Sequence, residues 1–171
     1  MATGKRVTAA VLLIGDEVLS GRTQDRNLNQ IARFLAPLGI NVMECRIVPD
    51  ETDVIVDALN TLRAGHDYVF TTGGIGPTHD DITADAVAAA FGVGIDVRAD
   101  ALAIIEDWYA KTQTPVTESR KRMARIPDGA SLIVNPVTGA PGFQTGNVLT
   151  LAGVPSIVAG MLNDIDHRLE G

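Results

Sequence analysis

The 171-residue chain has one cysteine, a shortage of positive charge and no long hydrophobic run. Cys45 alone cannot form a disulfide within the chain, which excludes a disulfide scaffold and fits a reducing cytoplasm. The apolar segment Val7 to Ile14 is of strand length and too short to cross a membrane. Gly15, Asp16 and Glu17 follow it, and these are not the residues of an export signal. We therefore expect a cytoplasmic protein with no membrane contact.

The scarcity of positive charge excludes a second class of partner. The chain carries 14 Lys and Arg against 21 Asp and Glu, a net charge of −7. An acidic chain repels a nucleic-acid backbone, so we expect no nucleic-acid partner. A small anionic ligand remains compatible with this charge if a bound cation cancels it locally. The length and the hydrophobic content of 46% predict one globular domain over residues 1–171.

Strand-like and helix-like segments alternate along the chain. This alternation predicts an α/β fold with a mostly parallel sheet covered by helices on both faces. The segment 135–146 is too rich in turn formers to predict regular structure. The expected strands are 7–14, 40–48, 67–72, 93–97, 132–134 and 148–151, and the expected helices are 27–38, 52–64, 82–91, 100–111, 116–125 and 155–169.

Polar loops follow three of the expected parallel strands, at residues 15–27, 49–53 and 73–81. In an open α/β sheet, ligands bind at the carboxyl ends of the strands. We therefore expect these loops to lie together at one edge of the sheet and to form the site.

The loop after the third strand carries Gly73, Gly74 and Gly76. Glycines let the backbone approach a ligand closely and point its amides toward it. The start of the next helix adds free N–H groups and a positive dipole end, which suit a phosphate group. The pattern is no P-loop, because no Gly-Lys-Ser/Thr follows. It is no dinucleotide fingerprint either, because His79 stands where a third glycine is needed.

Acidic residues accompany each of these loops. Asp80 and Asp81 stand where a divalent cation could bridge protein and phosphate oxygens, although a helix cap explains them equally well. Asp16 and Glu17 are either a solvated turn or further metal ligands. Asp50 is either a helix cap or a catalytic carboxylate beside the glycine loop.

Other candidates have ordinary explanations beside the functional ones. Asp25 is a good N-cap for the helix that begins at 27, and a ligand role is compatible with that. His79 is either a solvated loop residue or part of the site. The basic residues between Arg120 and Arg125 form either a solvated helix face or a wall that attracts phosphate.

Five motifs occur in a fixed order along the chain, and together they resemble the molybdopterin-binding (MoaB/Mog) domain. The resemblance is closest to the amino-terminal part of competence/damage-inducible CinA-type proteins, and it covers Val7 to Leu162. The motifs that carry it are Gly15-Asp16-Glu17-Val18-Leu19-Ser20-Gly21, Asp25-Arg26-Asn27, Thr71-Thr72-Gly73-Gly74-Ile75-Gly76-Pro77-Thr78 with Asp80-Asp81, Asn135-Pro136 with Gly139-Ala140-Pro141-Gly142-Phe143, and Gly153-Val154-Pro155.

The resemblance implies a three-layer α/β/α sandwich with a phosphate-binding glycine loop. MoaB/Mog-type relatives adenylylate molybdopterin with magnesium, and carboxylates that match Asp50 and Asp81 are important in them. CinA-type domains are linked to metal-dependent hydrolysis of nucleotide diphosphates such as ADP-ribose. Relatives form dimers or trimers, so the resemblance implies a homodimer or homotrimer.

We therefore expect an enzyme that hydrolyses a nucleotide diphosphate with Mg²⁺ or another divalent cation. Molybdopterin adenylylation and a non-catalytic ligand-binding module are the alternatives. The expected residues are Asp50 and Asp81 in catalysis, Asp16, Glu17, Asp80 and Asp81 on the metal, and Asp25, Asn27, Gly73, Gly74, Gly76, Thr78, Asn135, Gly139, Ala140, Pro141 and Gly142 on the ligand.

Three positions depart from the CinA-type pattern. Many such sequences have Pro where His79 and Ala152 stand, and many have Glu where Ile157 stands. The missing acid weakens any transfer of function to the loop before Ile157. The chain also ends at a helix, without the carboxyl-terminal amidase domain of full-length CinA proteins. We expect either a natural short form or a segment of a longer protein.

Overall fold

The computed structural model describes residues 4–171 and confirms the predicted α/β fold. Six strands form the central sheet in the order β2-β1-β3-β8-β7-β6. The first four of these are parallel to their neighbours, whereas β7 runs antiparallel to both β8 and β6. The strands of this sheet are β1 (Val7–Ile14), β2 (Ile40–Val48), β3 (Tyr68–Thr72), β6 (Ser131–Ile133), β7 (Gly142–Thr145) and β8 (Val148–Leu151).

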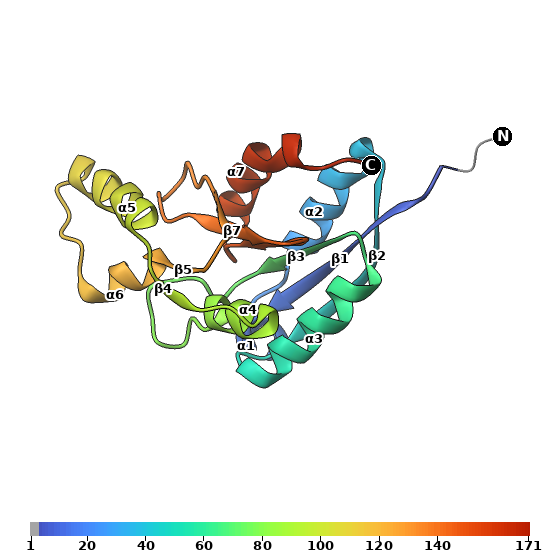
Figure 1. Ribbon diagram of the computed structural model, residues 1–171, viewed down its shortest axis with the longest axis horizontal. Coiled ribbons are helices and arrows are strands. Elements are labelled where there is room, and N and C mark those ends of the chain that lie inside the picture. Colours follow the sequence, from blue (N-terminus) through green and yellow to red (C-terminus); the bar gives the residue numbers. More distant parts are fainter. Residues whose placement is uncertain (1–3) are drawn as a thin grey trace.

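Helices cover both faces of the sheet (Figure 1). One face packs against α2 (Asn27–Leu35) and α7 (Pro155–Ile165). The other packs against α3 (Thr52–Gly65) and α4 (Thr83–Phe91), and α5 (Ala99–Lys111) extends the same core to one side of the sheet. Successive residues of β1 alternate between the two cores, because side chains along a strand point to opposite faces. Every residue of β1 except Thr8 is therefore apolar.

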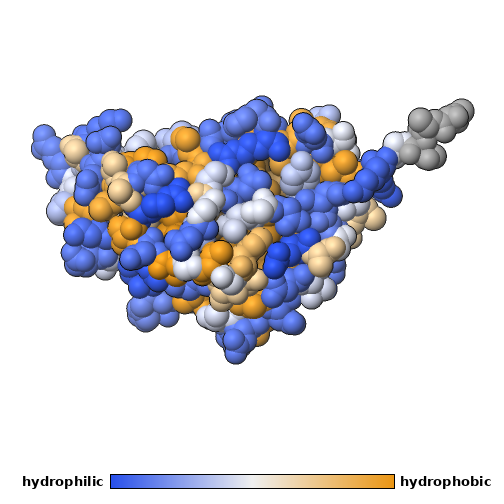
Figure 2. Space-filling model, in the orientation of Figure 1, coloured by the Kyte–Doolittle hydropathy of each residue, from blue (hydrophilic) through white to orange (hydrophobic). Residues whose placement is uncertain are grey.

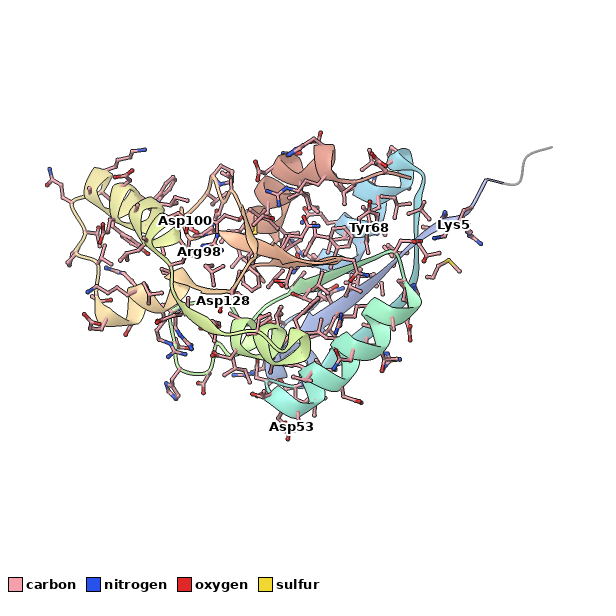
Figure 3. All side chains as sticks on the ribbon, viewed as in Figure 1. Lys5, Asp53, Tyr68, Arg98, Asp100 and Asp128 are labelled. Carbon is pink, nitrogen blue, oxygen red and sulfur yellow. The ribbon has the colours of Figure 1, made fainter. Side chains whose placement is uncertain are left out.

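A small lobe lies beside the main sheet and contains α5, α6 (Glu118–Lys121) and a two-stranded sheet of β4 (Ile95–Val97) and β5 (Arg125–Pro127) (Figure 1). Arg98 links the start of α5 to the segment before β6 by hydrogen bonds. Its Nε donates to Asp100 at 2.8 Å and its Nη1 donates to the Ala130 carbonyl at 2.6 Å. Figure 3 shows Arg98 and Asp100 side by side at this point.

Three predictions of secondary structure were wrong in part. The helix expected at 116–125 is only α6 and a 3-10 turn (Arg122–Ala124), because the Thr117 hydroxyl caps the helix and Arg125 already begins β5. The expected loop 135–146 contains β7, which is paired on both sides. The expected loop 15–27 contains the short helix α1 (Asp16–Leu19).

The expected helices 27–38 and 155–169 each end in a 3-10 turn, at Ala36–Leu38 and Asp166–Arg168. Figure 2 shows mostly hydrophilic residues on the visible face, with apolar patches between them. Within residues 4–171, no helix combines the length and the apolar character that a membrane crossing needs.

Candidate functional site

The carboxyl ends of β1, β2, β3 and β8 lie at one edge of the sheet, because these strands are parallel neighbours. The loops that follow the four strands meet there and enclose two adjoining cavities. The two cavities share Glu17, Gly74 and Asp81. The prediction that the polar loops gather at this edge is therefore confirmed.

The first cavity has a volume of about 450 Å³ and is strongly acidic. It brings together five carboxylates from three loops, with one arginine and one histidine. Its lining residues are Ile14, Asp16, Glu17, Arg22, Asp50, Gly74, His79, Asp80, Asp81 and Ile82.

Asp16 and Asp50 hold each other in place at the ends of β1 and β2. The Asp16 N–H donates to Asp50 Oδ2, and the Asp50 N–H donates to Asp16 Oδ1, both at 3.1 Å. Each carboxylate thus uses one oxygen to fix the opposite loop. Within the described residues, the other oxygen of each makes no hydrogen bond and remains free for a ligand.

Burial raises the pKa of Asp50 above its ordinary value, and the negative charges of Asp16, Glu17 and Asp81 raise it further. The hydrogen bond from the Asp16 N–H acts in the opposite direction but does not outweigh them. Close carboxylates repel one another, so each additional charge is harder to form. A cation placed among them would relieve this repulsion.

Asp81 shapes the far end of the glycine loop. Its Oδ2 accepts hydrogen bonds from the Thr78 N–H and the Thr78 hydroxyl, both at 2.9 Å. Asp80 is exposed and contacts only His79, with 3.4 Å between Nε2 and Oδ1. One oxygen of Asp81 therefore stabilises the loop, while the Asp80 side chain is exposed to solvent at the edge of the cavity.

The glycine loop is locked against its neighbours. The Thr83 hydroxyl donates to the Gly73 carbonyl at 2.9 Å, and the Thr83 N–H donates to the Gly74 carbonyl at 3.0 Å. Gly73 and Gly74 have φ values of +93° and +74°, which L side chains rarely adopt. A Cβ atom at Gly73 would lie 2.1 Å from the Ile14 carbonyl oxygen. Only glycine fits this position.

The amides of the same loop are free. Among the described residues, no hydrogen bond uses the N–H of Gly73, Gly74, Ile75 or Gly76. All four residues line the second cavity. Successive free amides in a left-handed glycine turn form an anion-binding concavity. The loop thus has the donors that a phosphate group requires.

The second cavity, of about 530 Å³, is mainly apolar. The glycine loop forms one side, and the segment after β6 and the segment after β8 form others. Its lining residues are Glu17, Thr23, Gly73, Gly74, Ile75, Gly76, Pro77, Asp81, Met123, Asn135, Thr138, Ala140, Ala152, Gly153, Val154, Pro155 and Ile157.

Asn135 stiffens the segment after β6. Its Oδ1 accepts from the N–H groups of Val137 and Thr138, both at 3.0 Å. Its Nδ2 donates to the Thr138 hydroxyl at 2.7 Å and to the Ala140 carbonyl at 2.9 Å. All hydrogen bonds of this side chain are therefore made within its own loop, so Asn135 fixes the shape of the cavity wall.

The remaining predicted residues of this segment do not line the second cavity. Gly139 and Pro141 line a separate cavity of about 310 Å³ beside Trp108, and Pro141 also lines a small cavity beside the glycine loop. Gly142 lies in β7, where a Cβ would meet the Thr150 carbonyl oxygen at 2.5 Å, and it lines none of these cavities. Of the predicted ligand residues in this segment, only Asn135 and Ala140 line the second cavity.

Asp25 and Asn27 lie beside the site. Asp25 caps α2, since it accepts from the N–H groups of Asn27 and Leu28 at 3.1 and 2.9 Å. The Asn27 Nδ2 donates to the Gly153 carbonyl at 2.8 Å, while its buried Oδ1 has no partner within residues 4–171. Both residues line a cavity of about 50 Å³ that also reaches Gly73.

Several residues that sequence reasoning did not select also line these cavities, among them Arg22, Thr23, Met123 and Ile75. Arg22 and Thr23 stand in a loop that was expected at the site, so their position was the available signal. Met123 had none, because its segment was expected to be a plain helix.

The basic cluster is largely engaged elsewhere. Arg125 forms two hydrogen bonds to Asp85 at 2.9 and 2.7 Å, and Arg120 lies over the Tyr109 ring. Arg122 and Arg125 line only a small cavity beside the glycine loop. A solvated and structural role therefore accounts for most of this cluster.

A metal site cannot be read directly from the side chains. Within residues 4–171, no three His, Cys, Asp or Glu side chains are grouped closely enough to hold a metal ion by themselves. Mg²⁺ commonly takes one or two protein carboxylates and completes its shell with water and ligand phosphates. The free oxygens of Asp16 and Asp81 suit that mode of binding.

The fold and the site define a class of protein: an open α/β domain with a glycine loop and a ligand-sized cavity at the carboxyl edge of its sheet. The sequence model of the probable molybdopterin binding domain matches residues 10–170, and the chain belongs to this family.

Curated relatives extend the same comparison. A protein from Caldivirga maquilingensis is 36% identical over 160 residues, which are 91% of this chain and 62% of the relative. One from Pyrobaculum calidifontis is 41% identical over 152 residues, 86% of this chain and 58% of the relative. The chain thus spans about three-fifths of the length of these relatives.

Solved structures agree on the fold. The protein CinA with unknown function from Thermoplasma acidophilum has a TM-score of 0.88 and 34% identity, with 96% of this chain and 99% of that chain covered. The tungsten cofactor synthesizing protein MoaB from Pyrococcus furiosus has a TM-score of 0.61 and 21% identity, with 97% and 94% covered. The predicted likeness to both types is confirmed.

Proposed function

We propose that the domain binds a nucleotide diphosphate with a divalent cation and hydrolyses its pyrophosphate. The observation that carries this proposal is the pairing of two features at one cavity edge. Free amides of the glycine loop stand on one side, and the carboxylates of Asp16, Glu17 and Asp50 stand on the other. The amides suit phosphate oxygens, and the carboxylates suit the cation that phosphates carry.

The donor set fits a hard divalent cation. Asp16 keeps one oxygen free, and Asp81 has its Oδ1 free of hydrogen bonds to the described residues. These oxygens would hold the ion, which when bound would neutralise charge on the phosphate oxygens. The raised pKa of Asp50 supports a cation site here, because the neighbouring carboxylates repel one another and a bound cation would reduce that repulsion.

Asp50 is the residue best placed to act on water. It stands at the end of β2, facing the acidic cavity, and its backbone and Oδ2 are fixed by Asp16. As general base it would take the proton of a water whose oxygen attacks one phosphorus. The new P–O bond forms as the bridging P–O bond breaks, and the departing phosphate keeps the electron pair.

The second cavity would hold the ring system of the ligand. Its apolar lining includes Met123, Val154 and Ile157, and its volume of about 530 Å³ lies in the range of small-molecule sites. The phosphates would lie at the glycine loop, where the two cavities meet. Ile157 thus contributes to ring binding at a position where an acid was expected from the resemblance.

The first experiment is a panel of nucleotide diphosphates, including ADP-ribose, screened with Mg²⁺ and Mn²⁺ for release of phosphate esters. The Asp81→Asn variant should lower turnover by at least ~100-fold, because it removes a charge while Asn still accepts the Thr78 hydrogen bonds. Asp53→Asn is the matched control. Asp53 is exposed at the start of α3, lines neither cavity and is labelled in Figure 3. Unchanged turnover in Asp81→Asn would refute the assignment.

Molybdopterin adenylylation is the second candidate, and the family description favours it. The same free amides and carboxylates would bind ATP and the pterin phosphate. Supplying ATP and molybdopterin and following AMP transfer separates this reaction from hydrolysis.

A non-catalytic binding module is the third candidate, and Ile157, which lines the second cavity where many CinA-type sequences have Glu, favours it. Metal-dependent binding of ADP-ribose with no product over several hours would select it over both reactions.

A further inference from the structure

Arg122 is a partly buried arginine whose charge has no partner. It begins the 3-10 turn Arg122–Ala124 of the small lobe. Within residues 4–171, its guanidinium takes part in no hydrogen bond and no ion pair, and its Nε is fully buried. A buried charge without a partner lowers the stability of a fold. Such a group calls for an explanation, and a ligand of opposite charge is one.

The carboxylates nearest to Arg122 are engaged elsewhere. Arg122 lines the small cavity beside the glycine loop together with Asp81 and Asp85. Both oxygens of Asp85 accept hydrogen bonds from Arg125, at 2.9 and 2.7 Å. Asp81 uses its Oδ2 for Thr78 and forms no ion pair with Arg122. The described part of the chain therefore leaves the charge of Arg122 without a counter-charge.

The turn that carries Arg122 is fixed along its length. Before it, the Thr117 hydroxyl caps α6 by accepting from the Arg120 N–H at 3.2 Å. At its end, Ala124 is fully buried, and its carbonyl accepts from the Arg98 N–H at 2.9 Å. Strand β5 follows directly and pairs with β4. The backbone of Arg122 is therefore held beside the glycine loop before any ligand binds.

The small cavity beside Arg122 adjoins the second, apolar cavity. The two share Gly74, Ile75 and Gly76, whose N–H groups make no hydrogen bond within residues 4–171. They also share Met123, the next residue after Arg122. Arg122 does not line the acidic cavity. An anion on the loop amides therefore has the guanidinium on one side and the acidic cavity, with its cation, on the other.

We propose that Arg122 binds a phosphate of the ligand at the glycine loop. The inference rests on the proposed function for the class of ligand, a nucleotide diphosphate. A guanidinium presents parallel N–H donors that match two phosphate oxygens, so it suits this ligand better than an ammonium group does. One phosphate of the pair faces the cation of the acidic cavity, and the other faces Arg122. The ligand supplies the counter-charge that the protein lacks at this position.

Arg22 is the other arginine at the site, and it gives no such signal. It is exposed at the acidic cavity, so water solvates its charge. Its Nε also donates to the Ser20 hydroxyl at 3.3 Å. Among the arginines of residues 4–171, only Arg122 has a buried nitrogen without a hydrogen-bond partner. The proposal therefore commits to Arg122.

The stability of the protein without ligand gives the first test. Arg122→Met keeps the aliphatic stem and removes the charge. Because no described group binds the guanidinium, the urea midpoint of this variant should equal or exceed that of the wild type. Arg125→Met, which breaks the two hydrogen bonds to Asp85, should lower the midpoint. A lower midpoint in Arg122→Met as well would show a structural role for Arg122 and would overturn the proposal.

Ligand affinity gives the second test and should change in the opposite direction. The probe is α,β-methylene-ADP with Mg²⁺, because its bridging carbon prevents hydrolysis. In Arg122→Met its dissociation constant, measured by titration calorimetry, should rise at least about tenfold, as expected for one lost charge-assisted hydrogen bond. Adenosine has no phosphate and should bind wild type and variant equally. Lys121→Met is the matched control, since Lys121 is paired with Glu118 at 3.0 Å, and it should leave the affinity for the probe unchanged.

The outcomes separate this proposal from hydrolysis. Equal affinity of wild type and Arg122→Met for the probe, or an equal loss of affinity for adenosine, would overturn the role of Arg122 alone. Binding that depends on Arg122, without release of phosphate esters from ADP-ribose, would reject hydrolysis and leave the role of Arg122 intact. A wild type that does not bind the probe with Mg²⁺ would overturn both.

Discussion

Replacing Gly73 by alanine tests how tightly the glycine loop is held. The residue has φ +93°, and placing an L residue in the left-handed region costs roughly 1–2 kcal/mol. The added Cβ would also lie 2.1 Å from the Ile14 carbonyl oxygen, a backbone atom that cannot rotate away. Forcing strand β1 aside costs about 1–3 kcal/mol more, so we expect a total of about 2–5 kcal/mol.

Gly92→Ala is the matched comparison. Gly92 has φ +65° at the end of α4, but a Cβ there meets no atom within 4 Å. It should lose only the roughly 1–2 kcal/mol of backbone strain. In both variants alanine lowers the conformational entropy of the unfolded chain by the same amount. This small stabilisation cancels when the two variants are compared.

Urea unfolding of the two variants measures the difference. The free energy of unfolding should be about 1–3 kcal/mol lower for Gly73→Ala than for Gly92→Ala. The melting temperature should differ by roughly 2–4 °C for each kcal/mol. Equal losses in the two variants would refute the close contact between Gly73 and strand β1.

The remaining predictions concern the acidic cavity and its wall. Because its folded-state pKa is raised, protonated Asp50 stabilises the fold below its ordinary pKa of about 3.9, and this contribution disappears as pH rises through the folded value. Asp50→Asn should therefore gain stability relative to wild type between pH 3 and pH 7, measured by urea unfolding. Mg²⁺ at 100 times its dissociation constant should stabilise the wild type by about 2.7 kcal/mol and Asp16→Asn much less, measured by thermal shift. Asn135→Ala removes four hydrogen bonds and should lower the free energy of unfolding by about 2 kcal/mol or more.

A specific result would contradict each of these three predictions. A constant stability difference between wild type and Asp50→Asn across the pH range would contradict the raised pKa. Equal Mg²⁺ stabilisation of the wild type and Asp16→Asn would place the ion elsewhere. For the third, Asn147→Ala is the comparison, since Asn147 Nδ2 makes two hydrogen bonds. A smaller loss at Asn135 than at Asn147 would show that the loop is not held by this side chain.

Much of the fold could be predicted from local pattern. Strand β1 was predicted with its bounds, because seven of its eight residues, all except Thr8, are apolar, and such a strand is buried on both faces. The end of α4 at Gly92 was predicted from the glycine that follows it. These features depend on residues close together in the chain.

Strands β5 and β7 were missed for a physical reason. Each has three or four residues, and β5 ends in Pro127 while β7 begins with Gly142. Neither residue favours a strand. Strand β7 exists because it is hydrogen-bonded to β6 and β8 on its two sides. Such pairing joins distant residues, and no short window of sequence contains it.

The candidate site divides in the same way. That Asp16, Asp50 and Asp81 share one edge followed from the order of strands and loops. The sequence could not predict which oxygen of each carboxylate is hydrogen-bonded and which is free, because that depends on distances between loops. Nor could the sequence predict that the side-chain amide of Asn135 forms its hydrogen bonds within its own loop.

The segment after β6 has a consequence for measurement. Asn135 and Ala140 face the larger apolar cavity, whereas Gly139 on the same segment lies against Trp108, so that a Cβ there would fall 2.4 Å from the ring. Trp108 is the only tryptophan in the chain. Its fluorescence therefore serves as an intrinsic reporter of any movement in this wall, and no attached dye is required to follow it.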